Sequence, residues 1–358
     1  MERKVVVTGI GVLSPIGIGR DRYWEALAAG ASGFGPITLF DTSSFHVHIG
    51  GEIQDFNPEL FLGKKGLREL DRSARLLCSA ARLAIDDARL RITDENSRSI
   101  GVSVGATFGS LHSISQFDRV GLIEGPRYVN PSHFPNTVLN SPASRVSIRF
   151  NIKGFNTTIS TGFCSGTDAL SYAADFIRLN RADAVLTGGV EELCEETFLA
   201  FHTLGYLSGN DGSEPLSCPF DVRRNGVILS EGAAVLLLEN EDHAGRRGAD
   251  ILARVLGCGN SFDPSAGGDF NHDGKGLKTA VTIALQDGRL GLEDIDYISA
   301  TANSLEGLDR METGVIKEVF GKRAYDIPVS SIKSMAGESF SASGSLSLAA
   351  AVDRKSVV

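Results

Sequence analysis

Short apolar runs alternate along the chain with longer segments in which apolar positions recur at helical spacing. Runs rich in Val, Ile, Leu and Ala predict buried strands at residues 4–8, 100–104, 184–187, 233–239, 251–255 and 297–300. Helical periodicity predicts helices at residues 23–29, 70–90, 169–179, 242–247, 274–285, 310–320 and 345–352. We interpret the Gly-Ile-Gly at residues 9–11 as the end of the first strand.

This alternation of strands and helices indicates an α/β protein whose strands are mostly parallel and buried. The order of strands and helices before about residue 245 is echoed after it, which indicates two related halves, residues 1–245 and 246–358. A chain of 358 residues is long enough for two cores of this size.

Charge and hydropathy exclude several classes of function. The chain has 35 Lys and Arg against 44 Asp and Glu, a net charge of −9, and it contains no basic run. This balance disfavours binding to nucleic acid. No apolar run is long enough to cross a bilayer, and the N-terminus lacks a signal-peptide pattern. We therefore expect a cytoplasmic protein that does not enter a membrane.

The cysteines, histidines and glycines do not follow the spacing of known metal or cofactor sites. Five cysteines are scattered without CxxC spacing, which disfavours both a disulfide framework and a zinc site. His46 and His48 alternate across an extended segment that offers no third ligand. The spacing of Gly9, Gly11 and Gly17 differs from that of a dinucleotide-binding loop. We expect neither a metal nor a cofactor.

Several segments, in order along the whole chain, resemble the β-ketoacyl-ACP synthase family. They read Val-Val-Val-Thr-Gly-Ile-Gly at 5–11, Gly-Gly-Val-Glu at 188–191, Pro-Phe-Asp at 219–221, Glu-Gly-Ala at 231–233 and Lys-Ser-Met-Ala-Gly at 333–337. Together they are more specific than any single glycine motif. The resemblance implies a thiolase-like α/β fold, a five-layer αβαβα sandwich of two duplicated halves. It also implies a dimer that acts on acyl chains carried by acyl carrier protein.

An active member of this family uses one cysteine and two histidines. The resemblance implies that the cysteine, at the start of a buried helix, takes up the acyl group, and that the histidines stabilise the enolate formed when the malonyl carboxylate leaves. In this chain Phe163 lies at the cysteine position, Thr301 at the first histidine position and Glu338 at the second. No histidine follows His272, so no alignment can supply an imidazole to either C-terminal segment.

Cys164 follows the nucleophile position by one residue. One residue at a helix start turns a side chain by about 100°, so we expect Cys164 to point away from the nucleophile's direction. A glutamate such as Glu338 is normally ionised at pH 7 and would repel an enolate. We therefore predict negligible condensing activity. Lys333, Glu312 and Asp309 match polar positions of the family's active site, either as supporting groups or as a structural ion pair.

The segment around Phe163 is also similar to that of chain-length factors, the β subunits of type II polyketide ketosynthases, which lack the cysteine. Residues 130–142 resemble the same branch. The resemblance implies a catalytically degenerate subunit that forms a heterodimer with an active ketosynthase, with a homodimer as the other possibility. Such a subunit shapes the tunnel for the acyl or polyketide chain. The candidate tunnel residues are Phe108, Leu111, His112, Ile114 and Phe117.

Two other functions stay open. An active 3-oxoacyl-ACP synthase would perform a decarboxylative Claisen condensation through Cys164. A protein that binds acyl chains or acyl carrier protein without chemistry would need no ketosynthase partner. The sequence thus leaves open whether the chain is an enzyme.

Active relatives continue past the helix at 345–352 into further strands and a Gly-Phe-Gly-Gly loop, so we expect an incomplete C-terminal half.

Overall fold

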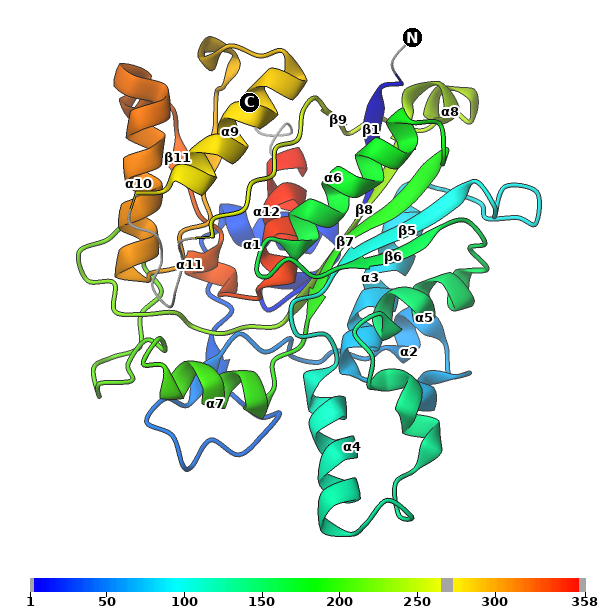
Figure 1. The fold of residues 1–358 in the computed structure, drawn as a ribbon, viewed down its shortest axis with the longest axis vertical. Coiled ribbons are helices and arrows are strands. Elements are labelled where there is room, and N and C mark those ends of the chain that lie inside the picture. Colours follow the sequence, from blue (N-terminus) through cyan, green and yellow to red (C-terminus); the bar gives the residue numbers. More distant parts are fainter. Residues whose placement is uncertain (1–2, 265–272, 354–358) are drawn as a thin grey trace.

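A seven-stranded sheet forms the centre of the molecule (Figure 1). The computed structural model describes residues 3–264 and 273–353. The strand order is β2-β1-β8-β7-β5-β6, and β9 pairs with β1. These strands are β1 (Val5–Ser14), β2 (Gly17–Ile18), β5 (Ile100–Gly105), β6 (Asn156–Ile159), β7 (Ala184–Glu191), β8 (Gly232–Asn240) and β9 (Ala253–Val255).

The sheet is mixed, whereas the sequence pattern predicted mostly parallel strands. Strand β5 runs parallel to β6 and β7, but β8 is antiparallel to both β1 and β7. The chain leaves β7 at Glu191 and returns at Gly232, which is paired with Glu191. The long connection therefore stays at one end of the sheet and does not cross back over its face. The alternation of strands and helices in the sequence does not reveal that β8 runs antiparallel to its neighbours.

Strand β1 continues through the Gly-Ile-Gly segment, so the prediction that the strand ends there is wrong. It pairs with β8 from Val5 to Leu13. The glycines are needed for a different reason: a Cβ on Gly11 would lie 1.9 Å from the backbone oxygen of Ala80, in helix α3 (Arg72–Asp87). The absent side chains let α3 pack directly on the strand. Helix α3 itself begins where the Asp71 carboxylate accepts a hydrogen bond from the Ala74 backbone N–H.

Helices cover both faces of this sheet. Helices α3 and α5 pack on one face, and α6 and α12 on the other (Figure 1). The helices are α1 (Arg20–Ala28), α2 (Glu59–Leu62), α3 (Arg72–Asp87), α4 (Leu111–Ile123), α5 (Ser141–Phe150), α6 (Ser165–Arg178), α7 (Glu195–Thr203), α8 (Glu241–Arg246), α9 (Lys275–Gly288), α10 (Glu306–Phe320), α11 (Lys333–Ala336) and α12 (Ser341–Asp353).

A smaller second sheet lies beyond α12. It consists of the parallel strands β10 (Ile298–Ser299) and β11 (Val329–Ser330), and α9 and α10 cover its outer side (Figure 1). The layers thus follow the helix–sheet–helix–sheet–helix order of the expected sandwich. A second pair of short strands, β3 (Gly35–Pro36) and β4 (Ile49–Gly50), forms a separate sheet. Residues 354–358, which follow α12, lie outside the described residues.

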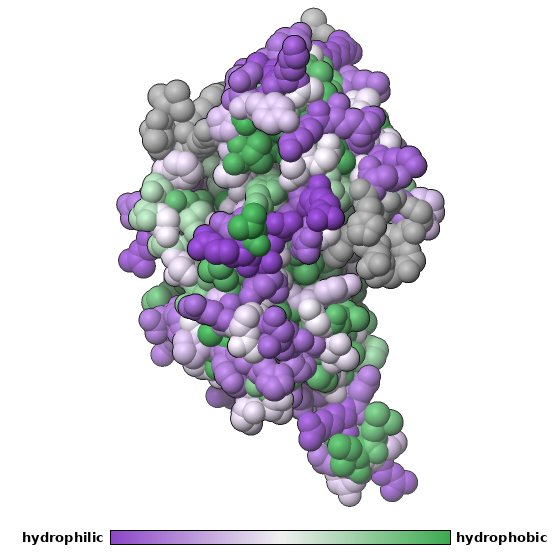
Figure 2. All heavy atoms as spheres, turned by 90° about the vertical axis from the view of Figure 1, so that its left-hand side faces the viewer, coloured by the Kyte–Doolittle hydropathy of each residue, from purple (hydrophilic) through white to green (hydrophobic). Residues whose placement is uncertain are grey.

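Helix α4 projects from the body of the molecule as an arm. None of its residues is buried, and it contacts mainly α7 and the 3-10 helix η2 (Pro131–Asn136). Figure 2 shows a projection at the lower end of the molecule with hydrophobic residues on its surface. Leu122 and Ile123, at the end of α4, are 86% and 71% exposed. No described helix is both long and apolar enough to span a membrane.

Candidate active site

The loop between β6 and α6 carries Phe163 and Cys164 to the N-terminal end of α6. Gly162 has a φ of 86°, a left-handed conformation that suits glycine. Its carbonyl oxygen accepts hydrogen bonds from the Thr107 hydroxyl (3.0 Å) and the Ser165 backbone N–H (3.2 Å). Cys164 is the residue that immediately precedes the helix. The loop geometry therefore fixes Phe163 and Cys164 at the position where the family resemblance places the nucleophile.

The Phe163 ring joins a cluster of aromatic side chains. Its centroid lies 4.9 Å from that of Phe340 and 6.3 Å from that of Phe201. Phe340, which is buried, also contacts Phe108 edge to face at 5.1 Å. Phe163 itself is 39% exposed, so one face of the cluster is open to solvent. This arrangement presents an apolar aromatic surface at the head of α6.

The Cys164 thiol points toward its own helix and not toward the aromatic cluster. Its Sγ atom lies 3.4 Å from the Thr161 carbonyl oxygen and 3.5 Å from Asp168 Oδ2. Partial burial raises the pKa of the thiol, and the Asp168 carboxylate raises it further. Reactive cysteines need a lowered pKa, so these surroundings suppress the thiolate.

Alkylation of Cys164 tests this geometry. Because its pKa is raised, we expect the rate with iodoacetamide to be low at pH 7 and to rise only above the pH at which a free thiol reacts. Asp168→Asn removes the neighbouring carboxylate and should increase the rate severalfold at neutral pH. Asp175→Asn, on the same helix, is the control and should leave the rate unchanged. Peptide mass spectrometry measures modification at each cysteine, and a fast reaction at pH 7 would contradict the assignment.

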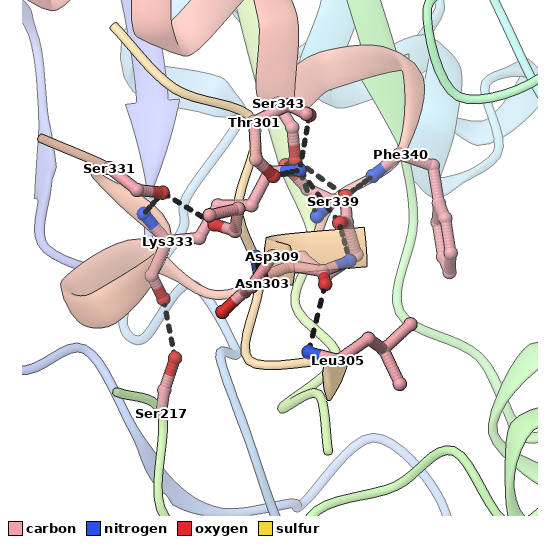
Figure 3. A network of polar contacts seen from close by, with 12 residues as sticks. Ser217, Thr301, Asn303, Leu305, Asp309, Ser331, Lys333, Ser339, Phe340 and Ser343 are labelled. Atoms are coloured by element: carbon pink, nitrogen blue, oxygen red, sulfur yellow. Dashed lines mark hydrogen bonds and ion pairs between the residues drawn. The ribbon is translucent and has the colours of Figure 1, made fainter. Parts of the chain in front are cut away.

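A buried ion pair occupies the region of the two histidine positions (Figure 3). The Lys333 Nζ atom lies 2.8 Å from Glu338 Oε2, and both side chains are at most 6% exposed. The Asn303 side-chain amide donates to the same Glu338 oxygen at 2.8 Å. The other oxygen accepts hydrogen bonds from the Phe340 backbone N–H and the Ser343 hydroxyl, each at 2.9 Å. The Glu338 carboxylate is therefore fully engaged within the chain.

The other polar positions predicted from the sequence join the same network. Lys333 Nζ also donates to the Thr301 carbonyl oxygen (2.9 Å) and lies 3.2 Å from the Thr301 hydroxyl. Glu312 accepts the backbone N–H groups of Thr301 and Ala302, each at 2.8 Å. Asp309 accepts the backbone N–H of Asn303 at 3.0 Å. Burial raises the pKa of both Glu312 and Asp309, and the bonds from backbone N–H groups oppose that effect.

Phe340 connects the aromatic and polar parts of the site. Its backbone N–H binds Glu338 while its ring packs against Phe163. Its φ of 47° is left-handed, a conformation that costs free energy for a bulky residue and is held here by contacts on both sides. The structure thus brings the Phe163, Thr301 and Glu338 positions into one neighbourhood.

The predicted tunnel residues divide into two groups. Phe108 reaches the aromatic cluster through Phe340. Leu111, His112, Ile114 and Phe117 lie instead on the α4 arm, and none of them is buried. On this arm the Phe117 ring lies 6.2 Å from that of Phe134 in η2. The arm residues would line a channel only if another chain covered them.

Sequence reasoning missed several members of the site. Asn303, Ser343, Phe201 and Phe340 carry no motif, and only their positions in the fold bring them to the other residues. Within residues 3–264 and 273–353, no group of three or more His, Cys, Asp or Glu side chains is placed to hold a metal ion.

The sequence profile of the β-ketoacyl synthase N-terminal domain matches residues 2–244, and that of the C-terminal domain matches residues 252–353. The chain is 36% identical over 347 residues to a 3-oxoacyl-[acyl-carrier-protein] synthase 2 of Coxiella burnetii, a match that covers 96% of this chain and 84% of that protein. The chain belongs to the β-ketoacyl synthase family.

Two solved structures extend the comparison. One is described as the ishigamide ketosynthase/chain length factor, with a TM-score of 0.91 and 32% identity over 99% of this chain and 86% of that one. Another is described as a type II PKS acyl-carrier protein in complex with its ketosynthase bound to the hexaketide. That match has a TM-score of 0.89 and 29% identity, and it covers 99% of this chain and 86% of the other. The thiolase-like ketosynthase fold expected from the sequence is thereby confirmed.

Proposed function

We propose that this β-ketoacyl synthase family chain is a chain-length-factor-like subunit with no condensing activity of its own. In this role it pairs with an active ketosynthase and forms one wall of the channel that holds the growing acyl or polyketide chain. One observation carries the proposal: the Phe163, Thr301 and Glu338 positions meet in one place and contain neither a thiol nor an imidazole.

The state of Glu338 supports the absence of condensing activity. An enolate intermediate needs hydrogen-bond donors directed at its oxygen. Glu338 offers only acceptor oxygens, and these are taken up by Lys333, Asn303, Ser343 and the Phe340 N–H. The Lys333 ammonium, the cation paired with Glu338, is engaged by Glu338 and by Thr301.

The edge of the main sheet supports pairing with a second chain. Strand β6 is the outermost strand in the order of the sheet, and the segment Asn-Thr-Thr-Ile has no charge and no proline. Charged residues and proline protect edge strands from pairing, and exposed edge strands without them are prone to pair with another chain. The α4 arm adds exposed apolar side chains that a second chain would cover. We propose that an active ketosynthase covers both features and that acyl carrier protein delivers the growing chain to that heterodimer.

The proposed channel wall is tested by substitution on the α4 arm. Replacing Phe117 by Ala removes a ring from the arm, so we expect the co-expressed heterodimer to release products longer by at least one extension unit. Gln116→Ala, one residue away on another side of the helix, is the matched control and should leave product length unchanged. Product mass spectrometry measures the distribution. An identical distribution for both variants would exclude Phe117 from the wall.

Co-purification tests the partnership itself. Tagged chain should retain an intact ketosynthase as a one-to-one complex, and the complex should survive gel filtration. An active synthase that works through Cys164 is the second candidate, because that thiol is exposed at the start of α6. A homodimer that makes product without any partner would favour this second candidate over our proposal.

A further inference from the structure

The α4 arm has no buried apolar face to fix its direction, although the Phe117 ring contacts Phe134 of η2. The arm has 13 residues and buries none of them. An isolated helix of this length is marginally stable in water, and most helices in proteins are fixed by an apolar face. Something other than a buried face must hold this helix at a defined angle to the body.

Three carboxylates on the segment from the end of β7 to the first turn of α7 hold the start of the arm. Glu191, the last residue of β7, accepts the backbone N–H groups of Thr107, Phe108 and Gly109, each at 2.9 Å. Glu192 accepts the backbone N–H of His112 at 3.2 Å. We call Glu191, Glu192 and Glu196 the carboxylate anchor.

The third member of the anchor binds side chains of the arm. Both Glu196 oxygens lie 3.3 Å from His112 Nδ1, and Glu196 also bonds with Ser115, one turn further along α4. Glu196 belongs to the first turn of α7, so it ties α4 to α7. The anchor therefore fixes the loop before the arm and the first turn of the arm, but not its tip.

The anchor is also connected to the aromatic cluster. The Ser341 hydroxyl donates to Glu191 at 2.7 Å, and Ser341 follows Phe340 in the chain. Phe108, whose N–H binds Glu191, packs its ring against Phe340. Glu191 thus holds together the loop that leads into the arm and the residues that border the Phe163 position.

We propose that Glu191, Glu192 and Glu196 are positioning residues that fix the direction of the α4 arm and, if the function proposed above is correct, thereby determine how far the arm closes the partner's channel. A rotation of the arm about its anchored end would move Phe117 and the tip, while the amino-acid sequence of the channel wall stays the same. Chain length would then depend on residues that do not touch the acyl chain.

The charges around Glu192 make this anchor sensitive to pH. No described Lys or Arg forms an ion pair with Glu191 or Glu192. Burial, together with the nearby Asp71 and Glu191 carboxylates, raises the pKa of Glu192 to about 8, although the bonds from the His112 N–H and the Ser73 hydroxyl favour the ionised form. Arg72, on α3, faces the same region but is paired with Glu231. A carboxyl with a raised pKa stabilises the folded arrangement at low pH, and that contribution is lost as the pH rises through about 8. The arm should therefore loosen in mildly alkaline solution.

Hydrogen–deuterium exchange of the full chain tests the anchor without a partner. Glu191→Gln replaces an acceptor of three N–H groups with an amide whose NH2 faces donors, so we expect exchange in residues 107–123 to accelerate by about 10-fold or more at pH 7. Glu192→Gln resembles the protonated carboxyl, so it should exchange like the unmodified chain at pH 7 but should lack the extra acceleration of the unmodified chain between pH 7 and 9. Glu195→Gln, an exposed neighbour on α7, is the matched control.

The same variants in the co-expressed heterodimer separate this inference from the proposed function. Circular dichroism checks that Glu191→Gln is folded. If the folded variant exchanges hydrogen in residues 107–123 as slowly as the unmodified chain, the proposed role of the carboxylate anchor is wrong. Faster exchange together with an altered product length supports both proposals. Faster exchange with unaltered product length leaves the anchor in place and contradicts the link between the arm and chain length.

Discussion

Replacement of Lys333 by methionine is expected to lower the free energy of unfolding by about 3–5 kcal/mol, because it leaves the Glu338 carboxylate buried without its cation. The methionine fills a similar volume, so the loss reports on charge more than on packing. Urea unfolding followed by circular dichroism measures the effect, and the midpoint should fall with little change in slope.

Two further variants make this result specific. Lys278 forms an ion pair with Glu318, but these side chains are 44% and 55% exposed, so Lys278→Met should cost less than about 1 kcal/mol. The double variant Lys333→Met/Glu338→Leu removes both charges and should recover part of the loss. Equal destabilisation by Lys278→Met and Lys333→Met would show that the buried pair has no special role.

Incubation of the purified chain with acyl and malonyl carrier proteins is expected to give neither an acyl adduct on Cys164 nor a condensation product. Loss of a catalytic nucleophile typically lowers kcat by about 10⁶-fold, and each lost oxyanion donor by a further factor of roughly 10²–10³. Intact-protein mass spectrometry detects the adduct, and an active ketosynthase under the same conditions is the positive control.

Phe163→Cys alone should not restore condensation. The new thiol would lie at the family's nucleophile position, but Thr301 and Glu338 would still supply no imidazole. We therefore expect at most a stable acyl adduct without product. An adduct on the unmodified chain that disappears in Cys164→Ser would refute the inactive assignment.

Much of the framework follows from local sequence pattern, because each predicted helix depends on its own periodicity. The helix predicted at residues 70–90 is α3 (Arg72–Asp87), and that predicted at 310–320 is α10 (Glu306–Phe320) without its first four residues. Helix α4 was not predicted as an element, since its apolar positions do not face a core of this chain. The glycines of β1 were misinterpreted because glycine is required there by the close packing of α3, a helix some 70 residues further along the chain.

The candidate site was only partly accessible to sequence reasoning. Family motifs led to Phe163, Thr301, Glu338 and Lys333, whose positions are set by short recognisable segments. The partners of Glu338, namely Asn303, Ser343 and the Phe340 N–H, come together through tertiary folding. No spacing rule connects a buried carboxylate to the donors that fold around it.

The central place of β8 sets an order for the folding of the nascent protein. Strand β8 lies between β1 and β7, and its partner in β1 was synthesised more than two hundred residues earlier (Figure 1). While the ribosome makes the intervening segment, β1 has no neighbour at this edge, and its apolar side chains need another cover. Strand pairings between segments so far apart in the sequence form slowly, and the intermediates that precede them are prone to aggregate. Dependence on chaperones should therefore persist at least until residue 240 has emerged from the exit tunnel, because only then can β8 pair with β1 and β7.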